Sequence, residues 1–149
     1  MKGVVLCVVL LSVYCSDVQG KQCNMTGVWS NTLGSVLTLH MDGPHLGGSL
    51  HSFVKLSQGG AGDKTGKLIG ELIGVVGKGK EPTFSLSISW KGGETVTAWV
   101  GQCFVNAPCP YLHSMWLLRS QSTEEEDWKA TRIGGDYFYP TNCDVNELP

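Results

Sequence analysis

The chain has 149 residues, and its 11 lysines and arginines against 13 aspartates and glutamates give a formal net charge of −2 at pH 7. It contains no block of basic residues that could neutralise a row of phosphates, so we expect no nucleic-acid partner. No stretch approaches the roughly 20 apolar residues that a membrane helix needs, so we expect no membrane partner either.

The first twenty residues are predicted to be a targeting segment. Lys2 gives a positive start, residues 4–13 form a short apolar run, and Val18-Gln19-Gly20 offers small or apolar residues before a cleavage point. We therefore expect a signal peptide over residues 1–20 and a secreted, extracellular protein. The mature chain, residues 21–149, has the size of one domain with one core.

The mature chain is predicted to form short β-strands. Residues 85–90 (SLSISW) alternate strictly between polar and apolar side chains, which is typical of a strand with one buried face. Other segments rich in Val, Thr and aromatic residues are expected to be strands, in chain order 26–29, 36–41, 68–76, 95–105, 112–118 and 132–139. Glycine, proline, asparagine or aspartate clusters separate most of them.

Helical periodicity is weak along the whole chain. Only residues 122–128 resemble a helix start, with Thr123 followed three residues later by Glu126, and we expect one turn at most. Residues 58–66 (QGGAGDKTG) are predicted to form a long loop between two strands. About eight short strands and 20 glycines predict an all-β antiparallel barrel or sandwich, and a closed barrel is favoured because closure removes exposed edges.

The cysteines suggest disulfide bonds. Two of the six lie in the predicted targeting segment, which leaves Cys23, Cys103, Cys109 and Cys143 with three pairings open. None of the four belongs to a C-x-x-C motif, and we expect no zinc site. Asn24 begins the sequon Asn-Met-Thr, which predicts a glycan on its side chain.

Signals for catalysis are weak. Ser35 does not lie in a G-x-S-x-G nucleophile elbow, and the four histidines lack a metal-type spacing such as H-E-x-x-H. Residues 74–80 (GVVGKGK) have the spacing of a phosphate loop, but Glu81 follows where a serine or threonine would hold magnesium. We therefore expect a binding protein rather than an enzyme, with no metal and no cofactor.

The five tryptophans carry more information about function. Trp29 is expected in the core, whereas Trp90 and Trp99 close one predicted strand and occupy the next, where their rings can face the barrel interior together. An eight-stranded barrel has room inside for one small ligand. Trp128 lies among charged neighbours in the segment DWKATRIG, residues 127–134, which predicts an exposed ring that serves something outside its own fold.

Five stretches of the chain share the pattern of one known family. They are residues 23–35 (CNMTGVWSNTLGS), 81–84 (EPTF), 99–104 (WVGQCF), 115–120 (MWLLRS) and 127–134 (DWKATRIG). On these stretches the chain resembles the avidins, the secreted biotin-binding barrels. The resemblance extends over nearly the whole mature chain and implies an eight-stranded antiparallel up-and-down barrel, assembled as a homotetramer with one biotin in each barrel.

The resemblance implies a polar end to the ligand site. Asn31 and Ser35 match positions that donate hydrogen bonds to the ureido oxygen of biotin, in the way that an oxyanion hole works. Asp136 and Ser52 match the acceptors for the two ureido nitrogens, and a carboxylate at position 136 should strengthen the polarisation of that group. Thr97 matches the hydroxyl that faces the ligand sulfur.

The resemblance also implies an apolar enclosure. The residues that match the aromatic box and its flanks are Trp90, Trp99, Trp116, Leu33 and Leu118. Ser57 and Thr95 match hydroxyls near the valerate carboxylate. Trp128 matches the tryptophan that one subunit inserts into its neighbour's site, which would couple ligand binding to assembly.

The chain departs from the family at Leu50 and at residues 91–94 (KGGE). At the second place the family often has an aromatic residue and a serine that wrap the ligand tail, so we expect weaker discrimination against modified biotins than in its relatives. A third donor to the ureido oxygen, a tyrosine in the family, is replaced by Leu50, and one lost hydrogen bond should cost roughly 1 to 3 kcal/mol of binding free energy. Cys23 and Cys103 match positions that are bridged in the animal members. Cys109 and Cys143 have no counterpart, so a second disulfide between them and a bridge between subunits both stay open.

Two other functions fit the sequence less well. A lipocalin-like carrier of another small apolar ligand rests on the barrel and on residues 27–29 (GVW), but lipocalins carry a terminal helix that nothing here suggests. A structural or lectin-like sandwich would use the tryptophans as core alone. We therefore expect tight non-covalent binding and sequestration of biotin in the barrel interior.

Overall fold

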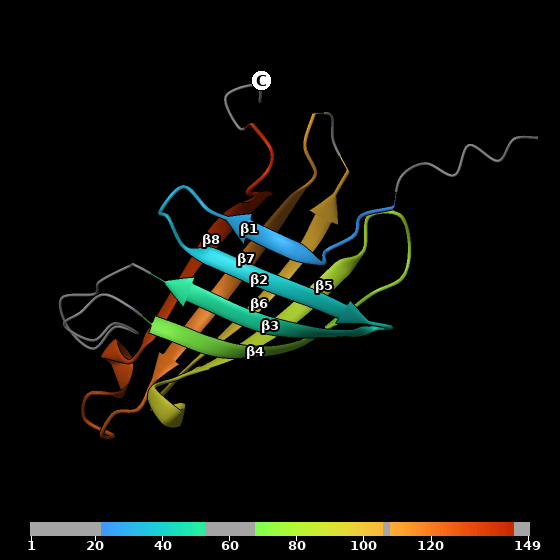
Figure 1. The fold of residues 1–149 in the computed structure, drawn as a ribbon. Helices are drawn as coiled ribbons and strands as arrows, with labels where there is room; N and C mark the ends of the chain where they lie inside the picture. Colours follow the sequence, from blue (N-terminus) through green and yellow to red (C-terminus); the bar gives the residue numbers. More distant parts are fainter. Residues whose placement is uncertain (1–21, 53–67, 106–107, 145–149) are drawn as a thin grey trace, which may run out of the picture.

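Eight antiparallel strands follow one another in sequence order around a closed barrel in the computed structural model, which describes residues 22–52, 68–105 and 108–144 (Figure 1). They are β1 (Gly27–Ser30), β2 (Val36–Asp42), β3 (His45–Ser52), β4 (Leu68–Val76), β5 (Thr83–Trp90), β6 (Thr95–Phe104), β7 (Tyr111–Ser120) and β8 (Thr131–Pro140). β1 pairs with β8, with Trp29 opposite Pro140 and Ser30 opposite Tyr139. This pairing closes the sheet, and the predicted up-and-down barrel is confirmed.

Strand β3 was missed by the sequence analysis, which predicted the other seven. Two glycines interrupt its pattern, although Leu46 and Leu50 both point into the barrel and are buried. Gly48 lies between them with a φ of 149°, and a Cβ at this position would overlap the carbonyl oxygen of Thr38 on β2. Close packing of β3 on β2 therefore requires a residue that carries no strand signal of its own.

Alternate residues of the strands fill the barrel interior. On β5, Phe84, Leu86, Ile88 and Trp90 are buried, whereas the serines between them lie toward the outside. The same alternation buries Leu37, Leu39, Leu46, Leu72, Leu112 and Phe138 on the other strands. Trp29 is only 2% exposed and its indole N–H donates to the Met25 carbonyl at 2.9 Å, so its predicted place in the core is confirmed.

Two short 3₁₀ turns lie at the same end of the barrel (Figure 1). They are η1 (Lys91–Gly93), between β5 and β6, and η2 (Asp127–Lys129), between β7 and β8. The single turn predicted over residues 122–128 is present in a shifted form, because η2 follows a turn in which the Glu126 N–H donates to the Thr123 carbonyl at 3.2 Å. The loop predicted over residues 58–66 lies outside the described residues.

Two disulfides tie the opposite end of the barrel. Cys23, before β1, is bonded to Cys103 near the end of β6, and Cys109, between β6 and β7, is bonded to Cys143 after β8. The Cα atoms are 6.3 Å and 6.1 Å apart. The pairing that the resemblance implied for Cys23 and Cys103 is therefore present, and the open question about the other two is answered by a bridge within the chain.

Replacing Cys109 and Cys143 together by alanine should lower the free energy of unfolding by up to about 4 kcal/mol, because the bridge closes a loop of 34 residues in the unfolded chain. Biotin affinity should stay within about twofold, since the bond lies at the end of the barrel away from η1 and η2. Urea unfolding and a biotin titration check the two halves of this prediction. A large loss of affinity with unchanged stability would contradict it.

Candidate ligand-binding site

A cavity of about 140 Å³ lies inside the barrel, toward the end that carries η1 and η2. The β1–β2 connection and strands β3, β5, β6, β7 and β8 supply its walls. The lining residues are Asn31, Leu33, Ser35, Leu50, Ser52, Trp90, Thr97, Trp99, Trp116, Leu118, Arg132, Asp136 and Phe138. The structure thus brings together every predicted ligand contact except Thr95, which does not line the cavity, and Ser57, which lies outside the described residues.

Asn31 organises the polar end of the cavity. Its side-chain oxygen accepts hydrogen bonds from the N–H groups of Leu33, at 3.1 Å, and Ser35, at 2.9 Å, and so stabilises the turn between β1 and β2. Its side-chain nitrogen donates to Asp136 Oδ1 at 3.2 Å. An amide nitrogen carries two N–H bonds, so Asn31 can hold Asp136 and still present a donor to a ligand.

Asp136 is the acceptor of this end. Burial raises the pKa of its carboxyl above the ordinary value of 3.8, and the N–H groups of Asn31, Trp99 and Trp116 lower it in part. The Trp99 N–H is buried and falls outside hydrogen-bonding geometry, so Asn31 supplies the defined bond to this carboxyl. A carboxylate held in an apolar pocket with few donors is a strong acceptor for ligand N–H groups.

The walls of the cavity are aromatic. Trp99 on β6 and Trp116 on β7 are directly opposite each other in the sheet, and Trp116 is in turn opposite Gly134 on β8. A Cβ at position 134 would overlap the Trp116 indole, so glycine gives this ring its room. The pairing register therefore places two tryptophans side by side in the wall of the cavity.

The third aromatic ring of the cavity wall, that of Trp90, holds the hydroxyl of Thr97 in place. Trp90 is the last residue of β5, and its indole N–H donates to Thr97 Oγ1 at 2.8 Å. Because this bond uses the oxygen of Thr97 as an acceptor, the hydroxyl proton of Thr97 is left to point elsewhere. Both residues are buried, which makes Thr97 a positioned donor in an otherwise apolar wall.

The floor and the rim of the cavity differ in character. Leu50 and Phe138 lie in the buried interior, and Ser35 is also buried, whereas Leu33 at the rim is 64% exposed. Thr95 is buried near the rim, but its hydroxyl donates to Ser120 Oγ at 3.4 Å. Of the predicted hydroxyl contacts, Ser35 lines the cavity, whereas Thr95 is hydrogen-bonded within the protein instead.

Trp128 stands apart from its own barrel. The side chain is 77% exposed, on η2, and lies outside the described lining of the cavity. The turn is anchored by Arg119, which forms an ion pair with Asp127 and donates to Thr131 Oγ1 at 3.0 Å. The ring is thus presented to the outside at the cavity end of the barrel, in agreement with the predicted exposure.

Two lining residues were not predicted, Arg132 and Phe138. Both lie on β8 on the same face as Asp136, four residues before it and two residues after it. The alternation of side chains along a strand would have found them once Asp136 was assigned to the interior. Arg132 in particular was not predicted because it lies in a segment of charged residues that was expected to face the solvent.

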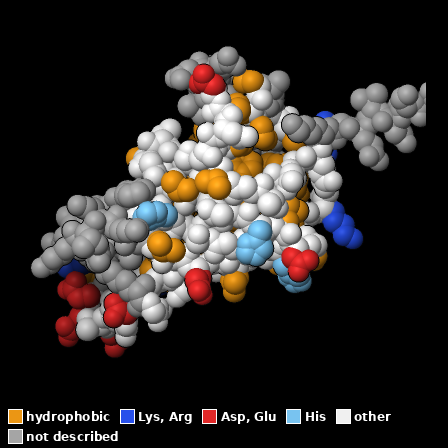
Figure 2. Space-filling model, in the orientation of Figure 1, with side chains coloured by type: hydrophobic (Ala, Val, Ile, Leu, Met, Phe, Trp, Pro, Cys, Tyr) orange, Lys and Arg blue, Asp and Glu red, His pale blue; other side chains and the backbone are white. Residues whose placement is uncertain are grey.

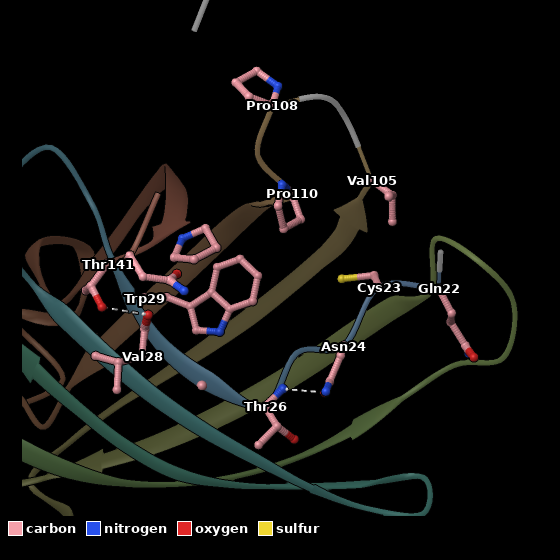
Figure 3. Close-up of a pocket in the computed structure, with 13 residues that line it drawn as sticks. Gln22, Cys23, Asn24, Thr26, Val28, Trp29, Val105, Pro108, Pro110 and Thr141 are labelled. Carbon is pink, nitrogen blue, oxygen red and sulfur yellow. Dashed lines mark hydrogen bonds between the residues drawn. The ribbon is translucent and has the colours of Figure 1, made fainter. Parts of the chain in front are cut away.

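A larger hollow, of about 830 Å³, lies at the opposite end, between the segment before β1 and the β6–β7 connection (Figure 3). Its polar side chains are bonded to the backbone of the chain: Asn24 Oδ1 accepts from the Thr26 N–H at 3.0 Å, and Thr141 Oγ1 donates to the Val28 carbonyl at 3.3 Å. The Gln22 side chain donates to Gly79 at 2.9 Å. These three side chains are thus hydrogen-bonded within the protein itself, whereas the predicted site residues line the interior cavity.

Other kinds of site find no support in the described residues. Within ranges 22–52, 68–105 and 108–144, His, Cys, Asp and Glu side chains form no group of three that could hold a metal ion. In the same part of the chain, no helix has the length and apolarity to cross a membrane.

Comparison with known proteins places this architecture in a family. The model of the avidin family matches residues 19–141. The chain is 32% identical to avidin of Gallus gallus, covering 86% of this chain and 85% of avidin, and 32% identical to avidin-related protein 4/5 of the same organism, covering 92% and 90%. Its structure is similar to that of xenavidin, with a TM-score of 0.68, 33% identity and coverage of 80% of this chain and 99% of xenavidin.

A biotin-binding protein from chicken has a similar structure as well, with a TM-score of 0.69, 31% identity and coverage of 81% of this chain and 98% of that protein. The family match, the identities and the shared barrel agree with each other over the same residues. The chain belongs to the avidin family.

Proposed function

We propose that this protein binds biotin non-covalently in the barrel interior and sequesters it, as a secreted protein. Family and fold support biotin binding in general. The observation that carries the proposal for this chain is the cavity itself, which joins a polar end built on Asn31 and Asp136 to aromatic walls from three strands. Such a combination suits a flat ring with a strongly polar edge.

The polar end matches the chemistry of a ureido group, which has one acceptor oxygen between two donor nitrogens. Asn31 and Ser35 would donate to the oxygen, and Asp136 and Ser52 would accept from the two nitrogens. Charge-assisted hydrogen bonds to a buried carboxylate are about twice as strong as neutral ones. The Asp136 carboxylate would therefore polarise the ureido group toward the donors on its other side.

The aromatic walls match the bicyclic ring. Trp90, Trp99 and Trp116, with Leu118, would enclose it, and the Thr97 hydroxyl would face the sulfur. A carboxylate in the wall of the cavity opposes a purely apolar ligand, because such a ligand would shield the charge from water and offer it no N–H group. A lipocalin-like carrier of apolar molecules is therefore disfavoured.

Assembly into a homotetramer is the second part of the proposal. Exposed apolar side chains face outward from β6, β7 and β8, where Val100 is opposite Met115 and Leu117 is opposite Ile133. A continuous apolar surface of this kind marks an association face. On the side seen in Figure 2 the apolar side chains are more scattered, and acidic side chains gather at the end where η2 lies.

Secretion and glycosylation belong to the same proposal. The two disulfides suit an oxidising compartment, and removal of residues 1–20 would leave Asn24 close to the new N-terminus. Asn24 is exposed, as a glycan requires. Mass spectrometry of the secreted protein, before and after deglycosylation, tests both points.

The deciding experiment is calorimetric titration of residues 21–149 with biotin, accompanied by light scattering of the same sample. One biotin per chain in a four-chain particle is expected. The absence of both heat and a thermal shift would overturn the ligand assignment, and a one-chain mass at micromolar concentration would overturn the tetramer.

Replacing Leu50 by tyrosine should tighten biotin binding about 10-fold to 100-fold, because a phenolic hydroxyl at this position would give the ureido oxygen a third donor. Leu50 lines the deep part of the cavity and is almost fully buried. Leu50→Phe is the matched control, since it adds the ring without the hydroxyl. Dissociation rates of labelled biotin check the prediction, and an equal gain in both variants would assign the effect to packing.

A further inference from the structure

Two polar groups of the barrel interior are buried without a hydrogen bond. Ser114 on β7 is 2% exposed and Trp99 on β6 is 6% exposed. Neither Ser114 Oγ nor Trp99 Nε1 forms a hydrogen bond within the part of the chain that the structure describes. A buried hydroxyl or N–H group lowers stability when it has no partner, so native proteins pair such groups with other protein groups or with ordered water. These two atoms therefore indicate a small polar ligand inside the wall of the barrel.

The strand register brings both groups close to Asp136. Ser114 is directly opposite Asp136 on β8 and directly opposite Gly101 on β6. Trp99 precedes Gly101 by two residues, so its side chain lies on the same inner face, diagonal to Ser114. Burial raises the pKa of the Asp136 carboxyl, and the nearby Trp99 N–H lowers it in part although it falls outside hydrogen-bonding geometry. Three polar groups thus share one region of the inner wall.

A void of about 10 Å³ adjoins these groups. Ser114 and Trp99 supply the polar side-chain groups of its lining, and its other lining residues are leucine, isoleucine and phenylalanine. The void shares Leu50, Trp99 and Phe138 with the ligand cavity, so it lies directly behind the wall that a ligand would contact. Its volume is about what one water needs, and a buried water requires about two to four polar partners.

The chemistry of the three groups suits one water. An indole N–H can only donate, a carboxylate can only accept, and a hydroxyl can do both. A water that accepts from Trp99 and donates to Asp136 has one further bond to exchange with Ser114, whichever direction the hydroxyl takes. One molecule would therefore satisfy both unpartnered atoms and add a donor to the carboxylate.

We propose that Ser114 and Trp99 hold one buried water against Asp136, and that this water keeps the carboxylate charged and oriented toward the ligand. Ser114 is then a positioning residue, because it acts on the ligand through the water and Asp136. A hydrogen bond donated to the charged form of a carboxyl favours that form. The inference rests on the proposed function, since Asp136 is the acceptor assigned to the ureido group of biotin.

Other ionisable groups leave this effect to the hydroxyl. Arg132, the other charged residue among the described lining of the ligand cavity, lies four positions before Asp136 on β8 and is unchanged in the test. His113 and Tyr137 adjoin Ser114 and Asp136 in sequence, but their rings stack on each other at 4.2 Å on the outer face of the sheet. A change at Ser114 therefore alters the surroundings of Asp136 without removing a charge.

The first test is a high-resolution crystal structure of the ligand-free parent chain and of Ser114→Ala. One ordered water within hydrogen-bonding distance of Ser114 Oγ is expected in the parent, and no water is expected at this place in the variant. A dry void in the parent would overturn the proposal.

The second test titrates the same proteins with biotin across the acidic range. Ser114→Ala should bind biotin about 5-fold more weakly at neutral pH, and the pH at which binding is lost should move upward, because the charged carboxylate has lost a donor. Ser114→Thr retains the hydroxyl and should behave like the parent. In an Asp136→Asn background, Ser114→Ala should change the affinity by less than about twofold.

The outcomes separate this inference from the proposed function. An equal loss of affinity with and without the Asp136 carboxylate, or an unchanged pH profile in Ser114→Ala, would overturn the role of Ser114 alone. Failure of the parent to bind biotin would overturn the ligand assignment, and the crystal structures would then decide the water by themselves. If thermal melts show that the extra methyl group of Ser114→Thr disturbs the barrel, the comparison in the Asp136→Asn background decides the question.

Discussion

A Trp128→Ala variant should bind biotin at least about 30-fold more weakly than the parent chain, yet melt at nearly the same temperature without ligand. The ring is 77% exposed in its own chain, so its removal costs the barrel few contacts. In a tetramer the same ring would close the cavity of a neighbouring subunit. Large aromatic side chains that fill a partner's pocket are typical binding hot spots.

Calorimetric titration and thermal melting at a fixed chain concentration measure the two halves of this prediction. Lys129→Ala is the matched control, because its ammonium lies 4.9 Å from the Trp128 ring on the same turn and carries no role in the cavity. Unchanged affinity in Trp128→Ala would remove the proposed link between binding and assembly. A lower melting temperature would show instead that the ring packs on its own chain.

Replacing Asp136 by asparagine should raise the melting temperature of the ligand-free protein at neutral pH. Burial raises the pKa of Asp136 in the folded state, so the folded protein holds its proton more tightly than the unfolded chain does. Stability is therefore lost as the pH rises from the ordinary value of 3.8 through the raised value. Asparagine has no such penalty, and its advantage should shrink as the pH falls toward 3.8.

The same substitution should weaken biotin binding about 10-fold at neutral pH, since a neutral amide oxygen replaces a charged acceptor. Binding by the parent should weaken as the pH falls through the raised pKa of Asp136, because the protonated carboxyl is a poorer acceptor. Binding by Asp136→Asn should lack this dependence. Titrations of both proteins across the acidic range check the prediction, and parallel pH profiles would contradict it.

Much of the barrel could be predicted because its strands carry local signals. The alternation of β5 is read directly from its letters, and the same periodicity assigns Trp90 to the interior. The alternation of polar and apolar residues is not visible in β3. Gly48 is required there by its close contact with Thr38 on β2, and such a contact between strands cannot be read from the residues of one strand. The residues alone left three cysteine pairings open for the same reason, since sequence separation does not report the distance between Cα atoms, and the resemblance implied the Cys23–Cys103 bridge.

The site shows a similar division. The polar residues Asn31, Ser35 and Asp136 were assigned by resemblance, together with three tryptophans, and the structure collects them around one cavity. The three tryptophans are Trp90, Trp99 and Trp116. The Thr95 hydroxyl donates to Ser120 within the protein, and only the register of β6 with β7 reveals this contact. Arg132 lies in a charged segment of the sequence. It shares a face of β8 with Asp136, because side chains alternate between the two faces of a strand and the two residues are four positions apart. The residues that were missed are those whose role depends on which face of a strand they occupy.

The two disulfides lie at one end of the barrel, so its two ends are stabilised by different kinds of bond. Covalent bonds join the chain at the base, whereas weaker hydrogen bonds and packing join the strand ends around the cavity mouth. Local opening requires far less free energy than global unfolding when few buried contacts are lost. A local opening at the mouth would leave both covalent bridges at the base intact, so the two ends of the barrel are held by bonds of different kinds.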